Sequence, residues 1–136
     1  MSFIFLISAM PLSDAQIKSL VNRNVWNDDC PVHYSELTLQ KVPYIDFEGF
    51  SQIGELLVSS KIVENVALIF EELYHLRFPI QQIRLIDDFD GDDVASMEAN
   101  NSSAFNGRKV MNTNRWSSHA YGVAIDINPH QNPYMV

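Results

Sequence analysis

Residues 117–129 read SSHAYGVAIDINP, and this stretch combines a turn, an alternating apolar run and two side chains that can bind a proton or a metal ion. His119 and Asp126 lie seven positions apart, with Gly122 between them. The alternation over 123–127 predicts a buried strand that carries Asp126 in its middle. Because an unpaired carboxylate is costly in an apolar setting, Asp126 needs a partner.

Two kinds of partner for Asp126 are physically reasonable. The first is a hydrogen-bonded pair with His119 or a salt bridge to Arg115, in which case the stretch is structural. The second is a zinc ion shared by His119 and Asp126, since imidazole nitrogen and carboxylate oxygen both bind zinc at about 2.0 to 2.2 Å. The spacing alone does not decide between a structural pair and a metal site.

Two upstream segments have the periodicity of helices. Residues 61–76 place apolar side chains three and four positions apart, and Pro79 ends the pattern, which predicts the longest helix of the chain. A shorter helix is predicted after Ser13, a favourable N-cap residue with Gln16 at the capping-box position.

Short apolar runs between these helices predict strands. Residues 37–40 form one, which Pro43 should disturb or confine to a sheet edge, and residues 80–86 form another. The elements do not alternate regularly between strand and helix. They therefore predict an α+β fold, with a small antiparallel sheet that carries Asp126 and helices packed on one side. We expect residues 1–136 to form a single domain.

Residues 87–93 concentrate five of the seventeen acidic residues of the chain. Aligning Gly91 with the glycine of a calcium loop places Ile86 and Met97 at positions that need a carboxylate. The segment is therefore predicted to be a solvated acidic turn. Residues 96–108 are polar and lack periodicity, which predicts a loop.

Composition excludes several classes of function. Nine Lys and Arg against seventeen Asp and Glu give a net charge of −8, which argues against binding to a nucleic-acid backbone. The single cysteine, Cys30, cannot form an internal disulfide. The apolar run within residues 1–12 is too short to span a bilayer, and it predicts either the remnant of a signal peptide or a first strand.

The motif S-x-H-x-x-G-x-A-x-D is met without a departure by residues 117–126. It resembles the zinc-binding motif of the VanY-like D-alanyl-D-alanine carboxypeptidase family, whose domain shares its fold with hedgehog signalling proteins. The likeness extends weakly upstream to about residue 30.

The resemblance implies that His119 and Asp126 are two ligands of a zinc ion. It also implies that Arg108 faces the substrate, where it would bind a peptide carboxylate or a developing oxyanion. It implies further that Ser117 orients the ligand loop and that Ser103 and Asn106 line the peptide groove.

Members of the family place a third zinc ligand, a histidine, and an acidic general base downstream of the Asn-Pro-Tyr of residues 132–134, whereas this chain ends at Val136. A catalytic zinc site needs about three protein ligands and a base. We therefore expect a C-terminally truncated domain with weak or absent peptidase activity. His130 is the nearest substitute for the third ligand, but Pro129 disfavours it because it interrupts the strand alternation.

The resemblance implies a zinc-dependent, peptidase-like protein that acts on bacterial peptidoglycan stem peptides, as a carboxypeptidase or an endopeptidase. The alternative is a non-catalytic module on the same fold that binds a peptide or a metal. A cell-wall substrate implies a place in the cell envelope or outside the cytoplasm, while the poor N-terminal signal leaves the cytoplasm open. The missing segment predicts an uncovered sheet edge through which copies of the chain associate.

Overall fold

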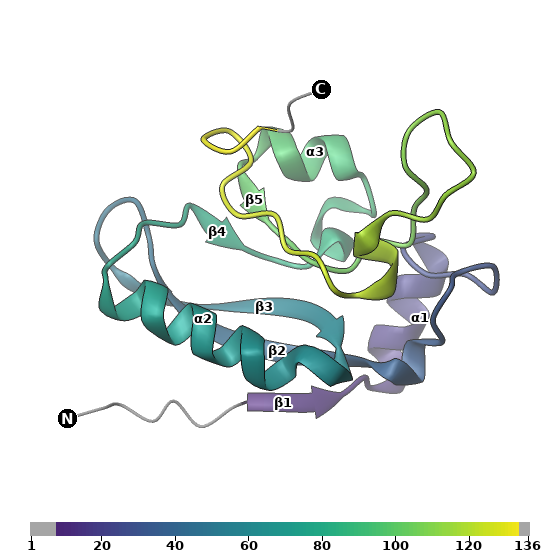
Figure 1. The fold of residues 1–136 in the computed structure, drawn as a ribbon, viewed down its shortest axis with the longest axis horizontal. Helices are drawn as coiled ribbons and strands as arrows, with labels where there is room; N and C mark the ends of the chain where they lie inside the picture. The colour runs from purple at the N-terminus through teal and green to yellow at the C-terminus, as the bar shows by residue number, and fades with distance from the viewer. Residues whose placement is uncertain (1–7, 134–136) are drawn as a thin grey trace.

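Strands β2 (Leu37–Ile45) and β3 (Ser51–Ser59) form a long antiparallel hairpin at the centre of the fold. The computed structural model describes residues 8–133. Strand β1 (Ser8–Pro11) pairs with the other side of β2, so the sheet order is β1-β2-β3. The α+β class and the small antiparallel sheet are thus confirmed (Figure 1).

The structure corrects the expected position of Pro43 and locates the first strand. Pro43 lies within β2, the central strand, opposite Ile53, and not at a sheet edge. It is tolerated there because the described part of β1 pairs only as far as Lys41. The strand predicted within residues 1–12 is found at its C-terminal end as β1, while residues 1–7 lie outside the described part of the chain.

Both predicted helices are present. Helix α1 (Asp14–Asn22) begins at the Ser13 N-cap with a complete capping box to Gln16. Helix α2 (Val63–His75) follows a 3₁₀ turn and corresponds to the predicted segment 61–76. No helix within residues 8–133 is long and apolar enough to cross a membrane.

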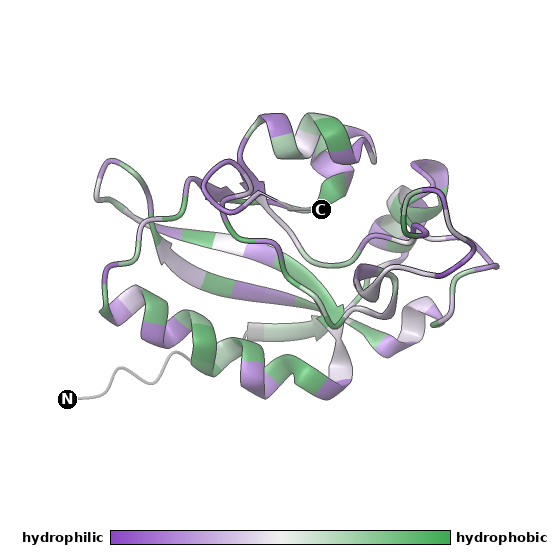
Figure 2. Cartoon of the chain, turned by 45° about the horizontal axis from the view of Figure 1, so that its top comes forward, coloured by the Kyte–Doolittle hydropathy of each residue, from purple (hydrophilic) through white to green (hydrophobic). Residues whose placement is uncertain are grey.

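The hairpin buries apolar side chains on both faces because side chains alternate along each strand. One face packs against α2, as Figures 1 and 2 show, and the opposite face packs against α1. The cluster on the α2 face consists of Val42, Tyr44, Leu56, Val58, Val66, Phe70, Ile80, Ile83 and Ala104. The cluster on the α1 face consists of Leu20, Val25, Trp26, Leu37, Leu57, Ile86 and Phe105.

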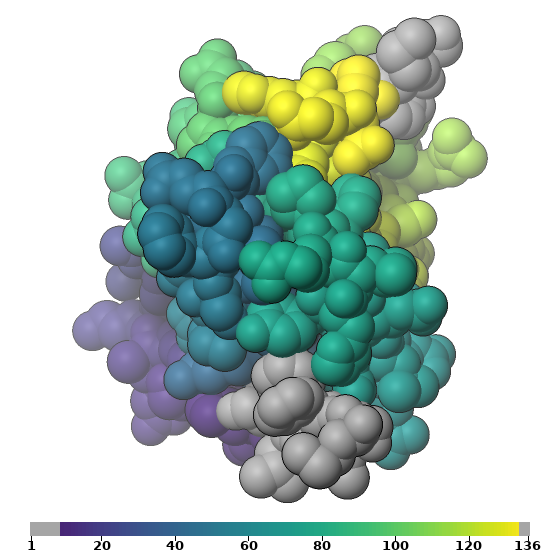
Figure 3. Space-filling model, turned by 90° about the vertical axis from the view of Figure 1, so that its left-hand side faces the viewer, coloured from purple at the N-terminus to yellow at the C-terminus, as the bar shows by residue number. Residues whose placement is uncertain are grey.

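The turn between β2 and β3 is fixed to the end of α2. Asp46 closes the turn by accepting hydrogen bonds from the backbone N–H groups of Glu48 and Phe50. Arg77, just beyond α2, donates to the carbonyl of Gly49. Figure 3 shows the two segments side by side, beneath the C-terminal segment of the described chain.

A second layer contains α3 (Asp93–Glu98), β4 (Gln82–Ile83) and β5 (Asn101–Ser102). The predicted strand over 80–86 is thus reduced to two residues that pair in parallel with β5. The prediction of a loop over residues 96–108 is wrong for residues 96–98, which belong to α3.

Buried asparagine side chains replace much of the missing strand pairing in this layer. Asn101 is 1% exposed; its amide donates to the carbonyl of Arg84 and to Ser96 Oγ, and its oxygen accepts from the N–H of Arg84. Asn128 similarly contacts the backbone of Pro79 and Gln81. Polar residues are therefore buried here because their hydrogen bonds are satisfied.

The strand predicted over residues 123–127 is wrong. Asp126 pairs with Ser103 in one isolated antiparallel bridge, and Asn128 ends the extended run with a φ of 46°. The predicted alternation still holds, because Ile125 and Ile127 pack against the core while Asp126 faces outward. Asp126 therefore lies outside the sheet that was expected to carry it.

Replacing Asn101 by alanine should destabilise the fold strongly. The variant removes three hydrogen bonds and leaves the Ser96 hydroxyl and the partly buried backbone groups of Arg84 without these partners, so we expect a loss of about 3 kcal/mol in the free energy of unfolding. Urea denaturation measures this loss. Asn65→Ala, at an exposed position of α2, is the matched control and should change stability by less than about 0.5 kcal/mol. Equal effects of the two substitutions would contradict the assignment.

Candidate metal centre

A short 3₁₀ turn, Ser118–Tyr121, places His119. Ser117 is its N-cap, and the Ser117 hydroxyl accepts a hydrogen bond from the N–H of His119 at 3.2 Å. Gly122 closes the turn in the left-handed region, with a φ of 74°. A Cβ at Gly122 would lie 2.7 Å from the backbone nitrogen of Ser59, so the motif needs glycine for conformation and for space.

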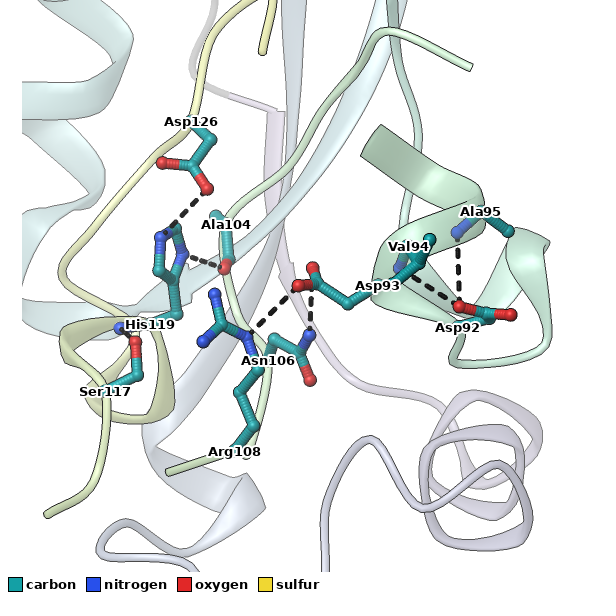
Figure 4. Close-up of polar contacts among 10 residues, drawn as sticks. All are labelled: Asp92, Asp93, Val94, Ala95, Ala104, Asn106, Arg108, Ser117, His119 and Asp126. Atoms are coloured by element: carbon teal, nitrogen blue, oxygen red, sulfur yellow. Dashed lines mark hydrogen bonds and ion pairs between the residues drawn. The ribbon is translucent and has the colours of Figure 1, made fainter. Parts of the chain in front are cut away.

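The imidazole of His119 is held between a backbone carbonyl and a carboxylate. Its Nδ1 lies 2.7 Å from the carbonyl oxygen of Ala104, which places a proton on Nδ1. Its Nε2 lies 3.2 Å from Oδ2 of Asp126 (Figure 4). The His119 side chain is 12% exposed and that of Asp126 is 51% exposed, so the pair opens to solvent on the Asp126 side.

Backbone pairing sets the position of Asp126. Ser103 and Asp126 exchange two backbone hydrogen bonds, of 3.1 and 2.9 Å. The structure therefore brings together His119 and Asp126, the two residues expected to bind zinc. It does not bring Arg115 to them, since Asp126 forms its ion pair with His119 among residues 8–133.

The geometry of this pair fits either a hydrogen bond or a shared tetrahedral ion. Two ligand atoms at about 2.0 Å from a tetrahedral zinc ion lie about 3.3 Å apart, close to the observed 3.2 Å between Nε2 and Oδ2. A carbonyl acceptor on the far ring nitrogen is also the usual support for a histidine ligand. His119 and Asp126 are thus suitable as two ligands of a metal ion.

A third ligand does not join this pair within residues 8–133, where no group of three or more His, Cys, Asp or Glu side chains could hold a metal ion. His130 is exposed, and its backbone N–H donates to Asn100. His130 is therefore not placed as a third ligand beside His119 and Asp126.

Hydrogen bonding shifts the pKa values of both members of the pair. Burial lowers the pKa of His119, but the contacts with Asp126 and Ala104 raise it more, so it lies above its ordinary value. The hydrogen bond from His119 lowers the pKa of Asp126 by more than burial raises it. The positive charge of Arg108 makes a smaller contribution and lowers the pKa of both groups.

Arg108 lies beside the pair on a segment paired with the ligand loop. Its carbonyl accepts from the N–H of Ser117 at 3.0 Å, and its Nε lies 3.4 Å from Oδ2 of Asp93. Asn106 is buried, and its amide lies 3.4 Å from Oδ1 of Asp93. Ser103 is also buried, and both residues contact the pair through the backbone: Ser103 pairs with Asp126, and the N–H of Asn106 donates to the carbonyl of His119.

The acidic segment 87–93 is a turn only at Asp90 and Gly91, because a 3₁₀ helix (Ile86–Phe89) precedes these residues and α3 begins at Asp93. Asp90 adopts the left-handed conformation, and Asp92 caps α3 by accepting from two backbone N–H groups. Sequence reasoning missed the role of Asp93 as partner of Arg108 and that of the Ala104 carbonyl as partner of His119. No local pattern could reveal either, since both contacts join segments about 15 residues apart.

Comparison with known proteins bears on the same segment. A family model described as D-alanyl-D-alanine carboxypeptidase matches residues 111–136. This segment contains both His119 and Asp126. The match supports that family broadly and does not single out its VanY-like branch. No curated protein and no solved structure matches the chain.

The His119–Asp126 pair should make the stability of the metal-free protein depend on pH. The raised pKa of His119 stabilises the fold fully below about pH 6.5, and this contribution is lost as the pH rises through the folded pKa. The lowered pKa of Asp126 stabilises the fold above about pH 3.9, and this contribution is lost as the pH falls through its folded pKa. The pair therefore contributes most near pH 5.5.

Asp126→Asn tests this dependence in chelator-treated protein. We expect the variant to lose about 0.5 kcal/mol more at pH 5.5 than at pH 8.5, a value kept small because Asp126 is half exposed. Thermal or urea unfolding at both pH values measures the difference. Asp88→Asn, which removes the carboxylate of an Arg84 ion pair, is the control and should show the same loss at both pH values. A pH-independent effect of Asp126→Asn would overturn the prediction.

Proposed function

We propose that this chain is a zinc-dependent, peptidase-like protein of the D-alanyl-D-alanine carboxypeptidase type, acting on peptidoglycan stem peptides. The observation that carries the proposal is the His119–Asp126 pair, with its 3.2 Å separation and its carbonyl support, within a segment that matches this family. A buried structural pair would not need the outward, half-exposed position of Asp126.

In this function His119 and Asp126 hold the zinc ion. Bound zinc supplies a Lewis acid that polarises a carbonyl and makes its water acidic. The Ala104 carbonyl keeps the proton on Nδ1, so that Nε2 is the ring nitrogen whose lone pair would bind the metal ion. Ser117 orients the turn by accepting from the N–H of His119.

Arg108 is the residue that would recognise the peptide. Its guanidinium lies beside the pair, where a planar cation suits a terminal carboxylate or the oxyanion that develops during hydrolysis. A free terminal carboxylate is the mark of a carboxypeptidase substrate, whereas an endopeptidase would use Arg108 on the oxyanion alone. A stem-peptide substrate places the protein in the cell envelope or outside the cytoplasm.

A second function is supported by the same structure. Because residues 8–133 bring only two ligating side chains together, we expect this chain to bind zinc weakly and to hydrolyse peptides slowly or not at all. The alternative is thus a module that binds a metal or a peptide without catalysis.

Metal binding and turnover separate these functions. We expect His119→Ala and Asp126→Ala each to weaken zinc binding by about 100-fold or more, measured by calorimetry on chelator-stripped protein. His75→Ala, on α2, is the matched control and should leave binding unchanged. His130→Ala should also leave it unchanged, because His130 does not join the pair.

Release of D-alanine from a muramyl pentapeptide tests catalysis on the same proteins. Turnover that requires His119 supports the peptidase, while zinc binding without turnover supports the binding module. An unaltered zinc affinity in both ligand variants would remove the metal from either function.

A further inference from the structure

A carboxylate, an amide and a guanidinium form a small network next to the candidate metal centre. Asp93 Oδ2 lies 3.4 Å from Nε of Arg108, and Asp93 Oδ1 lies 3.4 Å from the amide nitrogen of Asn106. We propose that Asp93 is a positioning residue, which orients the Arg108 guanidinium for a carboxylate at the end of the bound peptide. The inference rests on the proposed function and adds to it a residue from the acidic segment.

The contact atoms support this orientation. Asp93 contacts the Nε of Arg108, while neither Nη atom donates a hydrogen bond to another residue within 8–133. The Nη edge of arginine presents parallel N–H groups that match both oxygens of a carboxylate. Figure 4 places the guanidinium between Asp93 and His119, so the Nη edge remains for a ligand at the candidate metal centre.

Asp93 is itself held in place. It lies in the first turn of α3, next to Asp92, whose carboxylate accepts from the N–H groups of Val94 and Ala95 at 3.0 and 3.1 Å. Its two oxygens are divided between Asn106 and Arg108, which restrains the side chain from both sides.

Burial distinguishes this ion pair from an ordinary surface pair. The side chains of Asp93 and Arg108 are 29% and 39% exposed. The Nε atom of Arg108 is itself buried and has no hydrogen-bond partner, so its 3.4 Å contact with Asp93 is an ion pair. The pair of Arg84 and Asp88 is more exposed, at 55% and 42%, and lies within one turn of chain. Exposed pairs of that kind contribute little to stability, because solvent screens the two charges.

Loss of Asp93 should therefore change what Arg108 recognises more than it changes the fold. The guanidinium keeps its charge but loses the carboxylate that lies against its buried Nε. A ligand that needs two parallel hydrogen bonds should lose affinity, while a ligand without a carboxylate should be almost unaffected.

The test compares N-acetyl-D-alanyl-D-alanine with its C-terminal amide, each titrated by NMR into the full 136-residue chain. For Asp93→Asn we expect about tenfold weaker binding of the free acid and less than twofold change for the amide. Asp93→Glu should restore part of the preference for the acid. Asp88→Asn is the matched control and should preserve that preference fully.

A second measurement requires no variant. The Nε–H signal of Arg108 in the unaltered protein should exchange slowly with solvent, since the atom is buried against Asp93. Rapid exchange of this signal would overturn the inference even if Asp93→Asn failed to fold.

Arg108→Lys separates failure of this inference from failure of the proposed function. If Arg108→Lys leaves the preference for the acid unchanged, Arg108 does not recognise a carboxylate, and its role in the proposed function fails. If Arg108→Lys removes the preference while Asp93→Asn retains it, the positioning role of Asp93 alone is overturned. An equal loss for acid and amide in Asp93→Asn would likewise reduce Asp93 to a structural residue.

Discussion

Two backbone hydrogen bonds along the edge of β3 hold the segments that carry the candidate site. The N–H of Phe105 donates to the carbonyl of Leu57 at 2.9 Å, and the N–H of Ser59 donates to the carbonyl of Gly122 at 2.8 Å. The first places the Ala104 carbonyl, and the second places the turn that contains His119. Because both contacts involve one strand, the imidazole and its acceptor keep a fixed relation. The edge of β3 thus fixes both segments of the candidate site relative to each other.

The second layer relies on side-chain amides where longer strands would otherwise supply backbone pairing. Asn101 and Asn128 each contact backbone groups of the segment 79–84 through both ends of the amide. Such contacts fix the path of a segment that has no regular secondary structure. They also bury polar side chains, and this arrangement is stable only while every hydrogen-bond partner is present. The path matters for chemistry, because Asp126 lies two residues before Asn128.

Charge has different consequences at the scale of the chain and at the scale of the site. A net charge of −8 opposes the approach of an anionic peptide. The guanidinium of Arg108 is close enough to His119 and Asp126 to lower both pKa values, so it supplies a local positive charge where the proposed ligand would bind. Asp93 moderates that charge while it restrains the guanidinium. Recognition at this site would therefore depend on orientation more than on overall attraction.

Elements with local signals can be predicted from the amino-acid sequence. The helix over 61–76, the Ser13 cap and the turn formed by residues 117–122 follow from periodicity, capping and a left-handed glycine. The pairing of His119 with Asp126 was one of the alternatives that the motif allowed. Only the tertiary structure decided that Asp126 faces solvent outside the sheet and that the Ala104 carbonyl supports His119. The contact between Asp93 and Arg108 is likewise seen only in the tertiary structure. The reason is that these contacts are made between separate segments by backbone groups and single side chains, and such contacts leave no periodic trace along the chain.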